Sequence, residues 1–212
     1  MENFYNYFWI FIVGSIFGWF VEVIFAYIKT RKFQNRSSLL YGPFGMAYGI
    51  GSVFLNWVLG SFTDSSIITI FVISFLIGTI AEYIMSWGME LIFGFVVWDY
   101  SKRPLNIHGR VCFLYSLFWG ILGIVWVKYI SKAFSFFIGL IPTKLGYQLL
   151  IILLIFLILD AAISYLAVIR SNNRNKNIQS RNNLESFLDK HYNDQFLKKR
   201  YPQMFEYRKE QI

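Results

Sequence analysis

Hydrophobic positions in this sequence come in long blocks separated by short polar segments. Five blocks reach about 20 residues, the length that a helix rising roughly 1.5 Å per residue needs to cross a hydrocarbon core of about 30 Å. They cover residues 4–28, 39–59, 66–93, 111–130 and 146–169. The pattern therefore predicts an all-α integral membrane protein with about five transmembrane helices.

Two further segments do not fit a simple span. Residues 133–142 are apolar but too short, so we expect a re-entrant or interfacial segment there. Residues 171–183 are polar and predict a flexible linker, whereas the following segment places apolar residues at helical spacing. We therefore expect a membrane domain over residues 1–170. The tail, residues 171–212, is predicted to be cytoplasmic and to hold an amphipathic helix, either on the membrane surface or against the loops.

Composition and charge support the membrane assignment. Apolar residues make up 56% of the 212 positions and charged residues only 15%, against about 25% charged residues in a typical soluble domain. The net charge of +8 is explained by positive-inside topology and by attraction to anionic lipid headgroups, so we expect the lipid bilayer and no nucleic acid as a partner. The single cysteine, Cys112, excludes an intrachain disulfide.

Basic residues are concentrated in the loops after the first and third spans and in the tail. Three lysines near the fourth loop oppose this pattern but are outnumbered by the tail. The positive-inside rule places the basic loops and the tail on one side, the cytoplasm. The sequence thus predicts a multi-pass protein of the cell membrane with its N-terminus outside and its C-terminus inside.

A short motif occurs twice. Gly-x-x-x-Glu appears as Gly18 to Glu22 and again as Gly78 to Glu82, each time near the cytoplasmic end of a span. Each copy is followed by Arg-x-x-x-Leu-Tyr-x-x-Phe, which opens the returning span. The motifs run in the same direction, so they predict a parallel two-helix internal repeat about an axis along the membrane normal. The two glutamates should then lie at similar depth.

Four acidic residues fall inside or beside the spans: Glu22, Glu82, Glu90 and Asp160. A carboxylate at mid-membrane costs roughly 2.5–3.5 kcal/mol, so it must be paired, protonated or in contact with water. Two interpretations of the repeated glutamates stay open. They could form ion pairs with Arg36 and Arg110 that hold the bundle together, or they could line a polar cavity for a cation, a proton or a polar solute. Asp160 is expected to hydrogen-bond the serine one turn later.

The loop "WDYSKRPLNIHGR" separates the third and fourth spans. We predict that Arg110 turns back toward Glu82 or Glu90, because its planar guanidinium bonds two carboxylate oxygens and stays charged when partly buried. Asp99 would give it a second acceptor and fold the loop into a compact cap. The alternative is that Arg110 only reaches lipid phosphates.

The second span is interrupted by Pro43 and is rich in glycine. Gly45 and Gly49 form a small-xxx-small face, which favours close helix packing. The alternative is an unwound segment beside a binding site, as glycine-interrupted helices form in transporters. The sequence holds no phosphate-binding Gly-x-x-x-x-Gly-Lys motif, no metal-ligand cluster and no nucleophile motif. We expect no metal, no cofactor and no enzymatic activity.

The strings "LLYGPFGMAYGIG" and "WDYSKRPLNIHGRVCFLYSLFWGILG", with the Gly-x-x-x-Glu helices before them, resemble the bacterial family named Putative ABC-transporter type IV, the CmpB-like permeases. The resemblance covers most of residues 1–170. It implies a permease with a separate ATPase subunit, for which the loop at 98–110 could serve as the coupling element. The family motif falls on ten positions: Tyr41, Gly42, Pro43, Trp98, Asp99, Tyr100, Pro104, Asn106, Gly109 and Arg110.

The leading hypothesis is a permease-like membrane protein that transports or binds a small solute. A homo-oligomer of this chain is compatible with that hypothesis. A membrane scaffold or sensory partner that docks a cytoplasmic protein is the first alternative. A membrane-embedded enzyme using Glu22 and Glu82 as acid and base is the second. Neither the substrate nor the direction of transport follows from the sequence.

Overall fold

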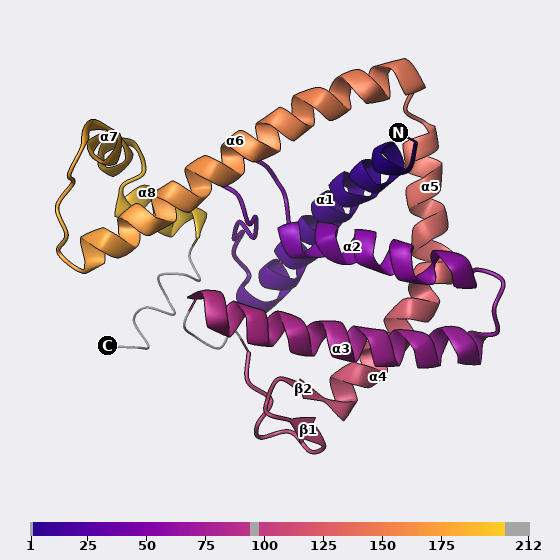
Figure 1. Cartoon of the computed structure of the whole chain (residues 1–212). Helices are drawn as coiled ribbons and strands as arrows, with labels where there is room; N and C mark the ends of the chain where they lie inside the picture. Colours follow the sequence, from indigo (N-terminus) through magenta and orange to yellow (C-terminus); the bar gives the residue numbers. More distant parts are fainter. Residues whose placement is uncertain (1, 94–97, 202–212) are drawn as a thin grey trace. The chain divides into compact units, whose positions relative to one another are not determined.

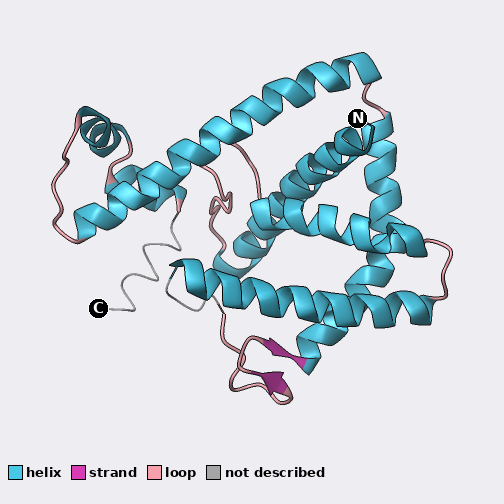
Figure 2. Cartoon of the chain, viewed as in Figure 1, coloured by secondary structure: helices cyan, strands magenta, loops and turns pink. Residues whose placement is uncertain are grey.

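A computed structural model describes residues 2–93 and 98–201 of the chain (Figure 1). The first half contains α1 (Glu2–Thr30), α2 (Met46–Leu59), the short 3-10 turn η1 (Gly60–Phe62) and α3 (Ile67–Phe93). The second half contains β1 (Asn106–Ile107), β2 (Val111–Cys112), α4 (Phe113–Val125), the π-helical η2 (Trp126–Ile130), α5 (Ser131–Gly139), α6 (Thr143–Asn175), α7 (Asn183–His191) and α8 (Asp194–Arg200). Apart from one two-residue strand pair, the regular structure of the described residues is helical, which confirms the all-α class (Figure 2).

Four helical stretches are long and apolar enough to cross a membrane: Asn3–Thr30, Ile67–Gly88, Phe113–Gly139 and Thr143–Asn175. In their most apolar windows only 22–39% of the residues are buried inside the protein, so most of this apolar surface is free to contact lipid or another apolar surface. Together with the shorter apolar α2, these stretches confirm a multi-pass membrane protein.

The fourth span is longer than the sequence pattern predicted. Helices α4, η2 and α5 follow one another without a break and run to Gly139. Residues 133–139 therefore end this helix, and the expected re-entrant or interfacial segment at 133–142 is wrong. The first helix breaker after β2 is Pro142, and lysines at 128 and 132 do not interrupt a helical backbone because their long stems reach away from it.

The second span is shorter than predicted, because helix α2 begins only at Met46. The backbone of residues 31–45 is irregular, and it includes the string "LLYGPFG". Pro43 lacks an N–H and disfavours the helical region for the residue before it, so no helix runs through it, and two residues later the N–H of Gly45 bonds the carbonyl of Ser15 at 2.9 Å. The unwound segment that was one of two interpretations is present. We call residues 38–45 the unwound segment.

The chain divides into two compact units. The first combines Met1–Val53 with Leu140–Ile212, and the second is Phe54–Gly139. This division differs from the expected one at residue 170, because the tail helices α7 and α8 pack in the same unit as α1 and α6. Residues 171–175 also continue α6 rather than belonging to a flexible linker.

Each unit contains one copy of the repeat. In the first unit Gly18 makes room for the ring of Tyr48 on α2, whose hydroxyl donates a 2.5 Å hydrogen bond to Glu22. In the second unit Gly78 makes room for the ring of Trp119 on α4, whose indole N–H donates a 2.9 Å bond to the glutamate four residues after Gly78. A side chain on either glycine would meet the aromatic ring at its base.

Further close contacts extend this correspondence along the helices. Phe11 lies against Gly49 in the first unit, and Phe71 lies against Gly120 in the second. One turn away, the small pair Gly14 and Ser52 has its counterpart in Ser74 and Gly123, with the glycine and serine exchanged. Within each unit, the contacts support the predicted two-helix repeat.

The contacts also correct the register of the returning helices. They match Tyr48 to Trp119, so that Tyr41 corresponds to Cys112 and not to Tyr115 as the shared string suggested. The shift is about one helical turn. The string misleads because it lies in the unwound segment in one copy and in β2 and the start of α4 in the other.

Candidate functional site

A buried carboxylate holds the unwound segment. Asp160 lies near the middle of α6 and is 2% exposed. Its oxygens accept hydrogen bonds from three successive backbone N–H groups, those of Leu40 at 3.1 Å, Tyr41 at 3.1 Å and Gly42 at 2.9 Å. Successive N–H groups that converge on one anion form a nest. The nest therefore accounts for the buried charge.

Neighbouring side chains satisfy the rest of this backbone. Ser164 donates to Asp160 at 3.1 Å, as predicted, and accepts from the N–H of Leu40 at 2.9 Å. Ser37 Oγ lies within 2.5–3.2 Å of three carbonyl oxygens of the loop. Arg200 of α8 donates to the carbonyls of Leu39 at 2.8 Å and of residue 42 at 3.0 Å. A loop without secondary structure is thus fixed by four side chains.

The position of this loop makes it a candidate functional site. Asp160 lies well inside a 33-residue span, so the irregular backbone around it is at membrane depth. Lipid offers no hydrogen bonds, and non-helical backbone is tolerated there only when it is buried in protein or lines a water-filled cavity. In transporters, interrupted helices of this kind stand beside the solute site.

The tail packs over the same loop. Leu40 forms an apolar core with Ala167 of α6 and with Leu188, Tyr192 and Leu197 of the tail. The hydroxyls of Tyr41 and Tyr192 are 2.7 Å apart. Burial, and after it this hydrogen bond, raises the pKa of Tyr192 to about 12. The prediction that an amphipathic segment lies against the loops is confirmed, and it also lies on α6.

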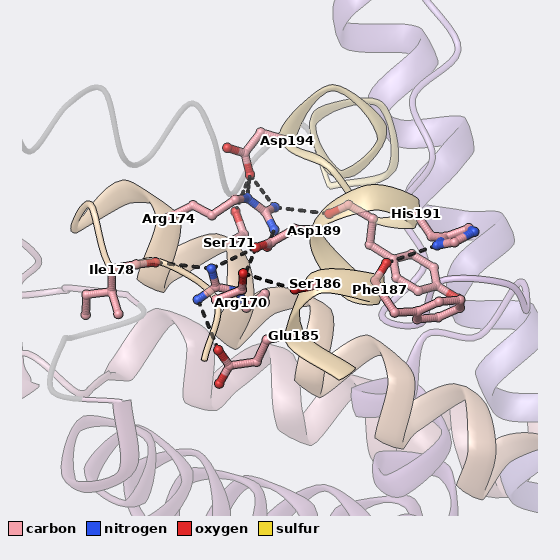
Figure 3. Close-up of polar contacts among 12 residues, drawn as sticks. Arg170, Ser171, Arg174, Ile178, Glu185, Ser186, Phe187, Asp189, His191 and Asp194 are labelled. Carbon is pink, nitrogen blue, oxygen red and sulfur yellow. Dashed lines mark hydrogen bonds and ion pairs between the residues drawn. The ribbon is translucent and has the colours of Figure 1, made fainter. Parts of the chain in front are cut away.

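Ion pairs join the end of α6 to the tail (Figure 3). Arg170 pairs with Asp189 at 2.8 Å, and Arg174 pairs with Asp189 at 2.5 Å and with Asp194 at 2.6 Å. Burial alone would raise the pKa of Asp189, but hydrogen bonds and charge from the two arginines outweigh it and lower that pKa. We call these four residues the tail clasp. The clasp explains why residues 171–175 stay helical.

Contacts at both ends of α1 and α6 show which segments share a side. The rings of Tyr5 and Tyr147 lie 4.6 Å apart at the N-terminal ends of the two helices. At their other ends, the loop after α1 and the tail after α6 meet through Arg200. The predicted common side for the first loop and the tail is therefore supported, while its assignment to the cytoplasm stays a prediction.

In the second unit, Glu82 is 7% exposed and accepts two hydrogen bonds. Tyr100 donates to one oxygen at 3.2 Å and Trp119 donates to the other at 2.9 Å. Arg110 does not reach it. Instead Arg110 forms an ion pair with Glu90, the second of its two predicted partners. The guanidinium also lies 5.9 Å from the ring centroid of Tyr83.

The expected link between Arg110 and Asp99 is absent. Asp99 accepts from the backbone N–H of Ser101 at 2.8 Å and from its hydroxyl at 2.9 Å, because a short local turn brings these donors closer. The backbone bond first, and then the hydroxyl bond, lower the pKa of Asp99. Asp99 therefore closes a turn of the loop and does not act as the second acceptor.

The loop is nevertheless a compact cap, as predicted. Asn106 bonds the carbonyls of Ser101 and Arg103 and the N–H of Gly109, and Trp98 donates to the carbonyl of residue 110 at 3.0 Å. Gly109 has a φ of +69°, which favours glycine. Five of the family-motif positions, Trp98, Asp99, Tyr100, Asn106 and Gly109, thus shape this cap. Pro104 stands in its turn at 101–105.

The predicted pairing of Glu22 with Arg36 is wrong. Glu22 is half-buried and accepts from Tyr48, while Arg36 donates to Gln34 at 2.8 Å. Arg36 lies in the irregular loop, six residues beyond the end of α1, where its guanidinium meets the side chain of Gln34 instead. Neither of the two repeated glutamates is therefore held in the protein by an ion pair with the arginine that opens the returning segment.

Sequence reasoning missed the residues that hold the unwound segment. Asp160 was singled out only for its bond to Ser164, and Arg200 and Tyr192 were taken as ordinary tail residues. One signal was available, since Asp160 is the sole charge in the apolar stretch of residues 145–169. A carboxylate there needs donors, and the bare N–H groups beside a proline-interrupted helix could supply them.

Comparisons with known proteins give one match. The family model described as Putative ABC-transporter type IV matches residues 9–165. No curated protein and no solved structure matches the chain. The matched range includes the unwound segment, both copies of the repeat, the cap and Asp160. It ends before the tail.

Proposed function

Because this chain belongs to the family described as Putative ABC-transporter type IV, we propose that it is a permease-like subunit that binds and moves a small solute across the membrane. The observation that carries this proposal is the unwound segment fixed around Asp160 at membrane depth. Irregular backbone has carbonyl and N–H groups that a regular helix keeps to itself, and a polar solute could bind them by exchange with the side chains that hold them in this structure.

A separate subunit would hydrolyse ATP, since the sequence contains no Gly-x-x-x-x-Gly-Lys motif. The cap is a suitable contact for such a subunit. It is held by its own hydrogen bonds, and it exposes Leu105 (75%) and Ile107 (54%). Large apolar side chains that are exposed together beside polar residues mark a contact site for a protein or a membrane. With an ATPase in the cytoplasm, we propose that the cap and the tail lie on the cytoplasmic side and the N-terminus outside.

The repeated glutamates are proposed to be helix anchors and not an acid and a base. Both oxygens of Glu82 are occupied by donors, and Glu22 is bonded to Tyr48. A scaffold role is the second candidate. It is favoured by the tail, where the docked helix α7 exposes Leu184 and Phe187 away from its buried face.

The test purifies the tagged full chain from its native membrane in mild detergent. A permease subunit should bring down an ATPase whose hydrolysis is lost in Leu105→Asp and Ile107→Asp. The matched control is Leu140→Asp, because Leu140 is similarly exposed (62%) but lies between α5 and α6. Equal hydrolysis in all variants contradicts the coupling role of the cap, and a nucleotide-independent partner favours the scaffold.

Transport itself is tested in cells. Cells that lack the chain are complemented with the parent or with Asp160→Asn at equal membrane levels, and solutes inside and outside are compared by mass spectrometry. We expect a class of solute whose distribution is restored by the parent only. If the parent and empty cells show the same distributions, the chain is not a transporter under those conditions and the proposal fails.

A further inference from the structure

A cavity of about 460 Å³ lies beside the unwound segment in the first unit. One wall is the loop at residues 35–39, another is the face of α6 that carries Ala161, Ser164, Tyr165 and Val168, and the third is formed by Arg200 and Tyr201. Its wall on α6 runs from Ala161, beside Asp160, to Val168, near the end of the apolar stretch, so we place its outer part in the headgroup region of a bilayer. The solute proposal does not use this cavity.

Two guanidinium groups line the cavity without a carboxylate partner among the described residues. Nε and Nη1 of Arg36 are buried and have no hydrogen-bond partner in this part of the chain, and only Nη2 is bonded, to Gln34 at 2.8 Å. Arg200 is bonded to backbone carbonyls. Asp160 attracts Arg200 electrostatically, but its oxygens are occupied by the N–H groups of the unwound segment.

An unsatisfied buried guanidinium is costly. A buried donor without an acceptor loses the hydrogen bonds that it makes to water in the unfolded chain, and this loss is larger when the donor is charged. Nε–H and Nη1–H lie on different edges of the guanidinium plane, so two separate acceptors are missing around Arg36 in the described part of the chain, and an oxygen of an anion can supply either one. The chain therefore presents a buried cation with two open donors at a cavity that is also lined by Ser38, Tyr165 and Tyr201.

The remaining wall is apolar and continues onto the outer surface of α6. Tyr165 is 65% exposed, and the apolar Ala161 and Val168 stand one turn to either side of it. An acyl chain could follow this surface while the headgroup enters the cavity. Basic pockets beside membrane helices bind anionic lipid headgroups in this way.

We propose that the cavity binds a phosphate group, with the guanidinium groups of Arg36 and Arg200 as its two cations. Two sources carry this chemistry. An anionic phospholipid fits the apolar wall, and a free phosphate ester would use the polar walls only. The bound anion would fix the first loop to α6 and so stabilise the unwound segment.

The experiment uses the full chain in a phosphate-free, mild detergent. Thermal stability and native mass spectra are recorded with phosphatidylglycerol, with a phosphate-free glycosyl diacylglycerol, and with glycerol phosphate. We expect phosphatidylglycerol to raise the melting temperature and to be retained in the mass spectrum, and Arg36→Gln to weaken its binding about tenfold or more. The matched control is Arg31→Gln, because Arg31 is an exposed arginine of the same loop and should bind like the parent.

The outcomes separate the sources and the alternatives. Stabilisation by phosphatidylglycerol alone identifies a lipid site, and equal stabilisation by glycerol phosphate identifies a free phosphate ester. Equal stabilisation by the glycosyl lipid, or unchanged binding in Arg36→Gln, overturns the proposal. If Arg36→Gln does not fold, Arg36→Lys keeps the charge but removes the open donors Nε and Nη1 and should bind more weakly. Absence of any phosphate-dependent stabilisation of the parent also overturns it.

Discussion

The two copies of the repeat share their helix contact but differ in how the connection between the helices is held. In each copy a glycine admits an aromatic ring whose polar atom bonds the glutamate one turn away. The first connection is held from outside, by Asp160 on a helix about 120 residues further along the chain. The second connection is held by itself, through Asn106 and a two-residue strand pair.

The two repeated glutamates also differ in burial and in the number of hydrogen-bond donors they meet. Glu82 is buried with two donors, one of them Tyr100 from its own connection, whereas Glu22 is half-buried with one donor. The second copy thus supplies the hydrogen bonds of its own connection and glutamate from its own residues. The first copy needs Asp160 of α6 to hold its connection, and in this sense we call it the open copy. In a transporter-related protein, the open copy offers the place where a solute or a partner can intervene.

The largest effect is expected where the two connections differ most. Asp160→Leu leaves the N–H groups of Tyr41 and Gly42 without an acceptor, while that of Leu40 keeps Ser164, so the change should cost about 2–6 kcal/mol at 1–3 kcal/mol each. The matched change in the self-held connection, Asn106→Ala, removes bonds of an exposed loop and should cost about 1 kcal/mol. Folded yield and melting temperature in detergent measure both. If Asp160→Leu is as stable as Asn106→Ala, the remote clamp does not hold the first connection.

The shared helix contact should respond alike in both copies. Gly18→Ala and Gly78→Ala place a Cβ inside the base of an aromatic ring, so each should lose about 1–3 kcal/mol. The control is Gly51→Ala on α2, where nothing lies within 4 Å of the added carbon and helix propensity favours alanine by about 0.5–1 kcal/mol. A large difference between the two losses would show that the copies do not share this contact.

Substitution of the two glutamates should again destabilise the two copies to different extents, with a smaller difference than for the connections. Glu82→Gln replaces one accepting oxygen with an NH₂ group that faces a donor, so we expect a loss of about 1–3 kcal/mol. Glu22→Gln keeps one accepting oxygen for its single donor and should lose less than about 1 kcal/mol. Thermal unfolding in detergent measures the pair. The reverse order would mean that Glu22 is the more constrained carboxylate.

We expect the smallest change in stability at the tail clasp, which belongs to the same unit as the first copy of the repeat. The pKa of Asp189 is lowered in the folded chain, so its contribution is complete above the ordinary carboxyl value of 3.8 and is lost as the pH falls through the lowered pKa. The protection factor of α7, which corrects the exchange rate for its intrinsic pH dependence, should therefore fall at acid pH, while that of the cap should change less. Asp189→Asn should remove this pH dependence, and an unchanged dependence would assign it to other groups.

Hydrophobic length predicted the helices well, because a bilayer imposes one length on every span. The bounds of α1 and α3 follow the apolar blocks closely. The same rule failed at residues 38–45, since apolar composition does not distinguish a helix from a loop that is buried in protein. It failed again at 133–142, where a π-helical turn lets one helix continue past the expected end.

Pairing of the charged residues was predicted less well. The sequence identified Glu22, Glu82, Asp160 and Arg110, but assigned arginines as partners where the structure uses tyrosine, tryptophan and backbone N–H groups. Charged residues are easily recognised in an apolar sequence, whereas the sequence does not show which backbone N–H groups are left free to donate. Only the irregular backbone created by Pro43 makes those donors available, and that requires the fold.

The distance along the chain between the unwound segment and Asp160 has a consequence for synthesis. Leu40 enters the membrane about 120 residues before its acceptor has been made. At a synthesis rate of about 5–20 residues per second, its N–H and those of the next two residues wait for several seconds or longer. The insertion machinery, water or a chaperone must satisfy them until α6 arrives. A chain truncated before α6 would therefore expose this backbone to lipid and become a substrate for membrane proteases.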